Sequence, residues 1–251
     1  MQESLVELLR CPVTKSKLTI TVIKIAFKKL DGKEVEVIEE AVLFATDVWF
    51  YPIIKGIPRL NVEALIDHKD FLQSAVPDYV ERKEKLLKKY AGLLDIIQKK
   101  NHRTRESFTK EWTLFNYSSD KTWNADAAGM LKRFLDETEE TADSLKGKII
   151  FDAGCGNGAL NSLLAKNGIT NIAMDFSNSI ENAYMVNEYS KVHFIQGDLQ
   201  FPPLLFNYFD IVHCSGVLIH TNNTELSFSC IEPLVKEKGK LSVWLYHPRD
   251  N

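Results

Sequence analysis

The chain has 251 residues, of which 45% are hydrophobic and 26% are charged. This composition is typical of a folded globular protein and excludes a largely disordered chain, a collagen-like repeat and a small disulfide-rich protein. The formal net charge of -3 excludes a basic field strong enough to hold duplex nucleic acid unaided.

The four cysteines, at 11, 155, 214 and 230, form no Cys-x-x-Cys pair, which predicts reduced thiols rather than disulfides. Residues 1–10 do not read as a signal peptide. No apolar run approaches the roughly 18–20 residues of a membrane helix. We therefore expect a cytoplasmic protein that does not contact a membrane.

Residues 1–61 predict a small β-rich module. Residues 18–27 and 35–44 alternate apolar and polar side chains, as half-buried strands do, and the Asp-Gly-Lys sequence between them is a turn signal. Proline and glycine then divide residues 51–60 into short extended pieces.

The segments LLRCPVTKSKL and YPIIKGIPRL in this module resemble the small zinc-ribbon-like domain of the activator subunit of tRNA and protein methyltransferases. That domain also precedes some bacterial methyltransferases. In its metal-binding relatives each half supplies a Cys-x-x-Cys pair. The matching positions here are Cys11 and Thr14, then Phe44 and Asp47, and zinc needs about four ligands. The resemblance therefore implies a module without metal, in which Cys11 is a buried apolar side chain.

Residues 62–145 predict a helical connector. Apolar residues recur at helical spacing from 79 to 97, and the acids among the lysines favour a solvated helix face over an RNA-binding face. A second helical stretch is expected over 104–140, followed by an acidic polar linker. Phe108 and Trp112 share one face of that stretch, which either packs in the core or forms a lid over a ligand pocket.

Residues 146–251 alternate predicted strands and helices. The strands at 148–154, 170–177, 191–198, 209–216 and 240–247 are near-continuous apolar runs, typical of a parallel sheet buried on both faces, and the last helix is expected over 223–239. The predicted fold class is α/β: a Rossmann-like, doubly wound sheet with a small N-terminal β-rich domain and a helical connector. Ligands are expected outside the carboxyl ends of the strands.

A glycine-rich loop follows the first of these strands. Gly154, Gly156 and Gly158 allow a tight turn and a close backbone approach to a ligand at a helix N-terminus. The loop also fits the dinucleotide pattern G-x-G-x-x-A, and Asp175 follows at the position of a ribose diol. However, Asp152 would repel a pyrophosphate and would favour the sulfonium and ammonium groups of S-adenosylmethionine.

Five ordered pieces within residues 148–246 resemble class I S-adenosylmethionine-dependent methyltransferases of the type that includes ubiquinone- and menaquinone-biosynthesis enzymes. They are FDAGCGNG, MDFS, QGDLQFPP, FDIVHCSGVLIH and LVKEKGKLSVW. The resemblance implies methyl transfer, with the glycines at the methionine part, Asp175 at the ribose and Asp198 with Leu199 at the adenine. The segment 107–115 also resembles one that folds over the cofactor. The residues that we thereby expect at the cofactor are Phe108, Trp112, Asp152, Gly154, Cys155, Gly156, Asn157, Gly158, Asp175, Phe176, Ser177, Gly197, Asp198, Leu199, Cys214 and Ser215.

Methyl transfer from a sulfonium mainly requires proximity and orientation. His220, just beyond the fourth strand, is the candidate base for a hydroxyl or acidic carbon, or else it shapes the loop or binds substrate. His213 lies within the strand and is interpreted as structural. The Asn-Pro-Pro-Tyr signature of many nucleic-acid amino-methyltransferases is missing, which argues against DNA as acceptor.

Several functions remain open at this point. The first is methyl transfer to a small molecule, and the others are a non-catalytic partner subunit or a tRNA- or protein-directed enzyme; an NAD-linked oxidoreductase is disfavoured by Asp152. The sheets of the family usually end with two further strands, and this chain stops after the fifth. That predicts a truncated chain, or an edge covered by a partner or by the N-terminal module. The oligomeric state is not indicated.

Overall fold

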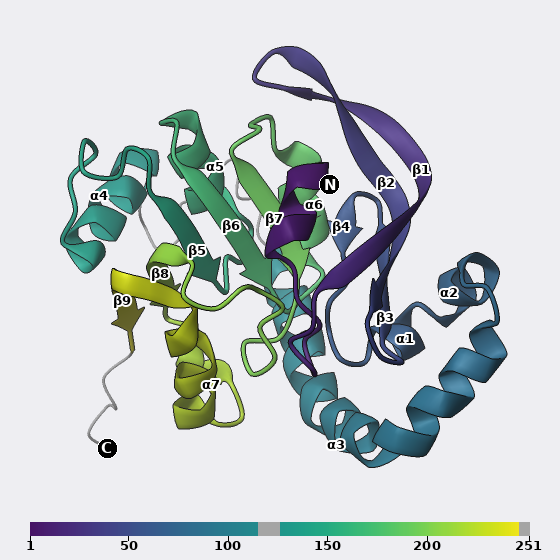
Figure 1. The fold of residues 1–251 in the computed structure, drawn as a ribbon. Coiled ribbons are helices and arrows are strands. Elements are labelled where there is room, and N and C mark those ends of the chain that lie inside the picture. The colour runs from purple at the N-terminus through teal and green to yellow at the C-terminus, as the bar shows by residue number, and fades with distance from the viewer. Residues whose placement is uncertain (115–125, 246–251) are drawn as a thin grey trace.

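The N-terminal part of the chain forms an antiparallel sheet. The computed structural model describes the backbone of residues 1–114 and 126–245 and the side chains of residues 1–101 and 126–245 (Figure 1). A 3-10 helix, η1, precedes a four-stranded sheet in which neighbours in sequence are neighbours in space. The predicted β-rich region is confirmed. Its elements are η1 (Glu3–Leu8), β1 (Leu18–Leu30), β2 (Lys33–Ala45), β3 (Phe50–Ile54) and β4 (Ile57–Pro58).

The helices of the connector have other bounds than expected: α3 includes the first expected stretch and the beginning of the second, and α4 lies in the later part of the second. Helix α3 continues through residue 114, because no proline or glycine interrupts residues 93–114. Asp126 then caps α4, since its carboxylate accepts a hydrogen bond from the backbone N–H of Gly129 at 2.8 Å. The helices are α1 (Ala64–Asp67), α2 (Lys69–Ala75), α3 (Tyr79–Leu114) and α4 (Ala127–Thr138).

The C-terminal part is a five-stranded parallel sheet in the order β7-β6-β5-β8-β9, so the predicted fold class is confirmed. The predicted helix over 223–239 is too long. It ends at Ile231 because Pro233 cannot continue it, and β9 begins at Val235, paired with Phe209. The elements are β5 (Ile149–Ala153), α5 (Ala159–Lys166), β6 (Thr170–Asp175), α6 (Ser179–Val186), β7 (Val192–Gln196), β8 (Phe209–Ser215), η2 (Leu218–His220), α7 (Thr224–Ile231), η3 (Glu232–Leu234) and β9 (Val235–Trp244).

The two faces of the parallel sheet pack against different partners. Ile150 and Ile211 contact an apolar cluster with Phe134 of α4 and Leu164 of α5. Residues one position along the same strands, such as Phe151, belong to the opposite face and to the largest core of the molecule. Side chains alternate along a strand, so each strand contributes to both cores.

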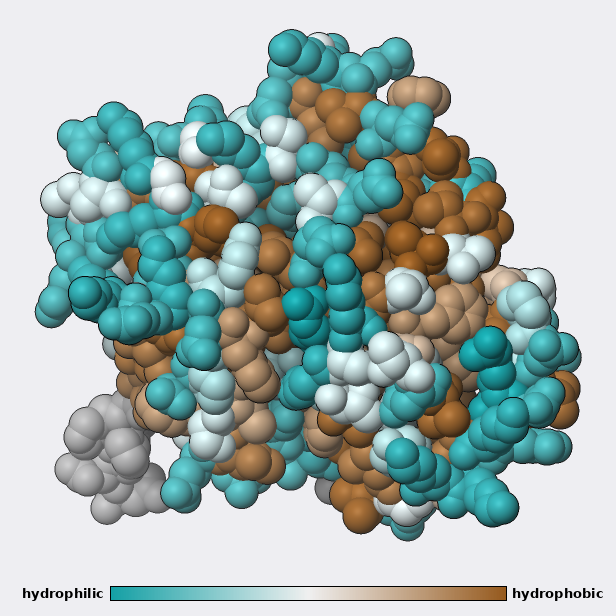
Figure 2. Space-filling model, in the orientation of Figure 1, coloured by the Kyte–Doolittle hydropathy of each residue, from teal (hydrophilic) through white to brown (hydrophobic). Residues whose placement is uncertain are grey.

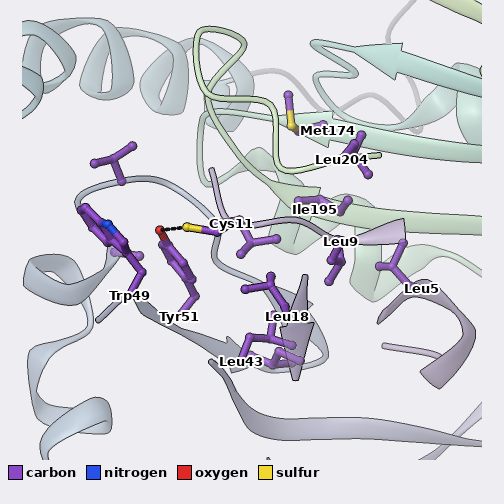
Figure 3. Close-up of a cluster of buried hydrophobic side chains, with 14 of the residues drawn as sticks. Leu5, Leu9, Cys11, Leu18, Leu43, Trp49, Tyr51, Met174, Ile195 and Leu204 are labelled. Carbon is purple, nitrogen blue, oxygen red and sulfur yellow. Dashed lines mark hydrogen bonds between the residues drawn. The ribbon is translucent and has the colours of Figure 1, made fainter. Parts of the chain in front are cut away.

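The largest core is shared between the two sheets. Figure 3 shows side chains of the N-terminal part, including Trp49 and Cys11, in one cluster with Met174 and Ile195 of the parallel sheet. The thiol of Cys11 lies 3.4 Å from the hydroxyl of Tyr51, and the Cys11 side chain is fully buried. Its interpretation as a buried apolar residue is confirmed. In the described part of the chain, no three His, Cys, Asp or Glu residues are arranged to hold a metal ion.

The N-terminal sheet lies against the edge strand β7. Arg59 forms a parallel bridge with Gln196, and the N–H of Leu60 donates to the carbonyl of Gln196 at 2.8 Å. The expectation that the N-terminal module covers the β9 edge is therefore wrong, because β9 is at the other end of the sheet.

The surface is mixed in character. Figure 2 shows hydrophobic side chains gathered over the β1–β2 hairpin and mainly hydrophilic ones over α3. On β1 the exposed apolar residues are Val22, Ile23, Ile25 and Phe27. Helix α3 carries exposed ion pairs four residues apart, Glu81 with Lys85 and Asp95 with Lys99, as a solvated helix face does. No helix among the described residues has the length and apolarity to cross a bilayer.

Candidate active site

A cavity of about 510 Å³ opens at the carboxyl ends of the parallel strands. It is bounded by the loops after β5, β6, β7 and β8, by η2 and by helices α3 and α4. The strand order reverses between β5 and β8, and in open α/β sheets this is where ligands bind. The volume falls within the range of small-molecule and cofactor sites.

The glycine-rich loop forms one wall of this cavity. Gly154 has φ of +96°, and a Cβ there would lie 2.5 Å from Cγ2 of Val217. Gly158 has φ of +71° and caps α5, although it does not line the cavity itself. Both positions therefore require glycine, for backbone conformation and for space. Cys155 and Asn157, between the glycines, line the cavity as expected from the sequence.

Asp175, at the end of β6, is held in place by the loops on both sides. Its Oδ2 accepts a hydrogen bond from the N–H of Gly156 at 2.8 Å. Its Oδ1 accepts two, from the N–H and the hydroxyl of Ser177, at 2.8 and 2.6 Å. Burial raises the pKa of this carboxyl, while these hydrogen bonds oppose the shift. The side chain lines the cavity beside Phe176.

Asp198, after β7, contacts helix α3. Its Oδ2 accepts hydrogen bonds from Lys100 at 3.0 Å and from Asn101 at 3.3 Å, and its Oδ1 accepts one from the N–H of Gln200. Gly197 and Leu199, on either side, also line the cavity. A carboxylate has about four acceptor positions, so the donors among the described residues leave one for a ligand amine.

His213 bridges two carboxylates in the cavity wall. Its Nδ1 lies 3.0 Å from Oδ1 of Asp152, and its Nε2 lies 2.9 Å from Oε2 of Glu137 on α4. The ring is almost fully buried and contacts Phe134 edge-on. Because an ionised carboxylate only accepts hydrogen bonds, both contacts are satisfied when both ring nitrogens carry a proton.

These contacts shift the pKa values of His213 and Glu137 in opposite directions. Burial alone would lower the pKa of His213, but the hydrogen bonds and charges of Asp152 and Glu137 outweigh burial and raise it from 6.5 to about 9. Burial would raise the pKa of Glu137, but hydrogen bonds from His213 and Arg133 lower it from 4.5 to about 2. At neutral pH the cluster therefore contains an imidazolium between two carboxylates.

Beyond His213 the cavity wall is formed by α4, β8 and β9. Arg133 donates from Nε to Glu137 at 2.7 Å and from Nη2 to the hydroxyl of Ser215 at 3.0 Å, and its guanidinium lies over the ring of Trp244. His220, in η2, also lines the cavity. The cavity thus joins a glycine loop with carboxylates on one side to a polar and aromatic pocket on the other.

Some residues expected at the cofactor lie elsewhere. The side chain of Cys214 is fully buried in the largest core, because it alternates with His213 and Ser215 and points to the opposite face of the sheet. Ser177 is buried and acts on Asp175 rather than lining the cavity. Phe108 and Trp112 fall within the range of α3, but their side chains lie outside the described residues.

Comparison with known proteins identifies the C-terminal part of the chain. The family described as Methyltransferase domain matches residues 151–243. The ubiquinone biosynthesis O-methyltransferase of Coxiella burnetii is 29% identical over 101 residues, which are 39% of this chain and 43% of that protein. This chain contains a class I S-adenosylmethionine-dependent methyltransferase domain. The chain matches less than half the length of these curated relatives.

Two solved structures are also similar to this chain. A putative methyltransferase from Bacillus halodurans C-125 has 22% identity and a TM-score of 0.41, covering 50% of this chain and 53% of that one. The complex of the Haloferax volcanii Trm112 methyltransferase activator with a putative methyltransferase has 21% identity and a TM-score of 0.38, covering 47% and 54%.

S-adenosylmethionine is the cofactor of such a methyltransferase domain, and the residues of the cavity fit it. The glycines of the loop have positive φ and carry no side chain, and the loop leads into the N-terminus of α5. A ligand can therefore approach its backbone closely. For Oδ2 of Asp152 no hydrogen bond is found within the described residues, so this oxygen can accept from a ligand ammonium.

Sequence reasoning missed several polar residues of the methyltransferase domain and its connector. The signal for His213 was available, since His213 and Ser215 occupy alternate positions in a strand that ends at the cavity. The roles of Lys100, Asn101 and Glu137 depend on how α3 and α4 pack, and no local pattern in the sequence indicates that packing.

Proposed function

We propose that this chain is a methyltransferase that transfers the methyl group of S-adenosylmethionine to a small-molecule acceptor. The observation that carries the proposal is that one continuous cavity is lined both by the glycine loop with Asp175 and Asp198 and by the polar and aromatic residues Arg133, Ser215 and Trp244. The first part suits a nucleoside cofactor, and the second suits an acceptor placed next to it.

The acceptor pocket supports a small molecule. Its wall contains Arg133 and Trp244, and the cavity as a whole has a volume of about 510 Å³. The net charge of -3 does not favour a nucleic-acid acceptor. Similarity to an O-methyltransferase of ubiquinone biosynthesis supports a hydroxyl as the acceptor group.

The residues of this chain would mainly bind and orient the two reactants. The cofactor, when bound, supplies the electrophilic methyl group on its sulfonium. Asp175 would hold the ribose diol, Asp198 the adenine amine and Asp152 the ammonium group. His220 lines the same cavity and would take a proton from an acceptor hydroxyl. His213 would not be that base, because both of its ring nitrogens carry a proton at neutral pH.

A methyl-transfer assay tests this proposal. The chain is incubated with S-adenosylmethionine labelled in its methyl group and with a cell extract separated into small-molecule, RNA and protein fractions. We expect label in the small-molecule fraction, and we expect His220→Gln to reduce it at least tenfold without weakening the binding of S-adenosylhomocysteine. Label only in RNA or protein would contradict the acceptor class, and no label in any fraction would contradict the activity.

A further inference from the structure

A buried arginine of the N-terminal module contacts the methyltransferase domain. Arg59 directly follows β4, and its side chain is only 1% exposed. Its Nη1 donates to Oε1 of Gln196 at 3.0 Å, and its Nη2 donates to Oε1 of Glu181 at 2.8 Å. Burying a charged group is unfavourable unless it is paired and hydrogen-bonded, so these two contacts fix the position of the guanidinium.

Gln196 connects Arg59 to the loop after β6 by hydrogen bonds from its side chain. It is the last residue of β7 and is 2% exposed, and its Nε2 points to the loop after β6. That nitrogen donates to Oδ1 of Asn178 at 2.9 Å and lies 3.3 Å from the carbonyl of Ser177. Because the guanidinium of Arg59 only donates, it holds the amide oxygen on its own side and thereby turns the amide nitrogen toward the loop.

The loop that Gln196 contacts determines the position of Asp175. Ser177 donates to the Asp175 carboxylate from both its N–H and its hydroxyl. The hydroxyl oxygen of Ser177 accepts from the N–H of Ser179 at 3.3 Å, and the hydroxyl of Ser179 donates to the carbonyl of Gly156 at 2.9 Å. A continuous set of hydrogen bonds therefore connects Arg59 to Asp175 and to the glycine loop.

We propose that Arg59 is a positioning residue for the cofactor site, acting through Gln196 on the loop at 176–178. Arg59 is not among the described residues that line the cavity, so it would act on the ligand only through other residues. It fixes the direction of the Gln196 amide, which orders the loop and aims Asp175 at the hydroxyls of a ribose. The proposal rests on the proposed function in one respect, that a ligand with a ribose diol binds in the cavity.

The structure provides a matched control. Lys55 belongs to the same module and pairs with the same carboxylate, Oε2 of Glu181 at 3.3 Å, but its side chain is 71% exposed. It makes no contact with Gln196 among the described residues. A change at Lys55 therefore alters the ion pair with Glu181 and leaves the hydrogen bond to Gln196 intact.

The test is calorimetric titration of S-adenosylhomocysteine into the whole chain and its variants, with thermal unfolding recorded for each. We expect Arg59→Met to weaken binding at least tenfold and Lys55→Met to change it less than twofold. If Arg59→Met fails to fold, Arg59→Lys keeps the charge but reaches only one of the two partners, and we expect a three- to tenfold loss.

A double-mutant cycle separates positioning from general destabilisation. If Arg59 acts through Asp175, then combining Arg59→Lys with Asp175→Asn weakens binding no more than Asp175→Asn alone, within twofold. Additive losses would overturn the positioning role, as would unchanged affinity in both Arg59 variants. Failure of the wild-type chain to bind the ligand would instead contradict the proposed function.

Discussion

The N-terminal module and the methyltransferase domain use buried polar groups differently. In the methyltransferase domain, the charged residues Asp152, Asp198 and His213 are buried beside a cavity, where they can meet a ligand. The N-terminal module instead buries aromatic rings around Trp49, and its buried cation Arg59 contacts the other domain. The methyltransferase domain therefore lines most of the cavity, whereas the N-terminal module contacts that domain through Arg59.

We expect the largest change in stability from a substitution at Trp49, which tests whether the two regions are stable separately. Trp49 is 1% exposed within the core that both sheets share. Trp49→Ala should lower the free energy of unfolding by about 3–5 kcal/mol. Because the core is shared, we expect a single transition for the N-terminal and parallel sheets in denaturant unfolding followed by tryptophan fluorescence and far-ultraviolet circular dichroism.

Trp49→Phe is the control for this prediction. The indole N–H has no hydrogen-bond partner within the described part of the chain, so phenylalanine removes an unsatisfied polar atom and keeps an aromatic ring. The loss should be much smaller than for alanine. Two separate transitions in Trp49→Ala would show that the module and the domain unfold independently.

The second prediction concerns the His213 cluster. His213→Gln removes the imidazolium that pairs with the Glu137 carboxylate, and it should destabilise the chain by about 3 kcal/mol at neutral pH. In the wild type, the folded state keeps the His213 proton up to about pH 9, whereas an unfolded histidine loses it near 6.5. The stabilisation is therefore complete below pH 6.5 and is lost as the pH rises through 9.

Urea unfolding between pH 6 and 9.5 measures this dependence. The difference in unfolding free energy between wild type and His213→Gln should shrink as the pH rises. A difference that stays constant over that range would show that His213 is not an imidazolium in the folded chain.

The third prediction concerns the glycine loop. A Cβ at Gly158 would lie 2.9 Å from Cβ of Ala183, at a φ of +71° that side chains rarely adopt. Gly158→Ala should therefore cost about 1–3 kcal/mol of stability, measured by thermal unfolding. Gly92→Ala, in the middle of α3 with open space at its Cβ, should be neutral or slightly stabilising. Equal effects of the two changes would contradict the geometry of the loop.

The smallest effect is expected on the surface of α4. Lys132 and Asp136 form an exposed ion pair four residues apart, and such pairs contribute little. Lys132→Ala should change the unfolding free energy by less than about 0.5 kcal/mol. A larger change, recorded by chemical denaturation at low and high salt, would mean that α4 depends on its surface charges.

The sequence indicated the parts of the fold and site that depend on local patterns. The parallel strands, the glycine loop and the carboxylates at 152, 175 and 198 follow one another in short motifs. The bridge between His213 and Glu137 joins residues 76 positions apart, and that between Arg59 and Gln196 joins residues 137 apart. Such contacts arise from how helices and sheets pack together, so periodicity in a single sequence does not reveal them.

In the proposed function, the cavity at the carboxyl ends of the parallel strands binds the cofactor through Asp175. Isothermal titration of the whole chain with S-adenosylhomocysteine, and separately with NAD, tests this assignment. We predict micromolar binding of the sulfur ligand at one site and no binding of NAD. Asp175→Ala should weaken binding more than tenfold, while Lys132→Ala leaves it unchanged. Absence of binding by the wild-type chain, or equal affinity in Asp175→Ala, would contradict the claim.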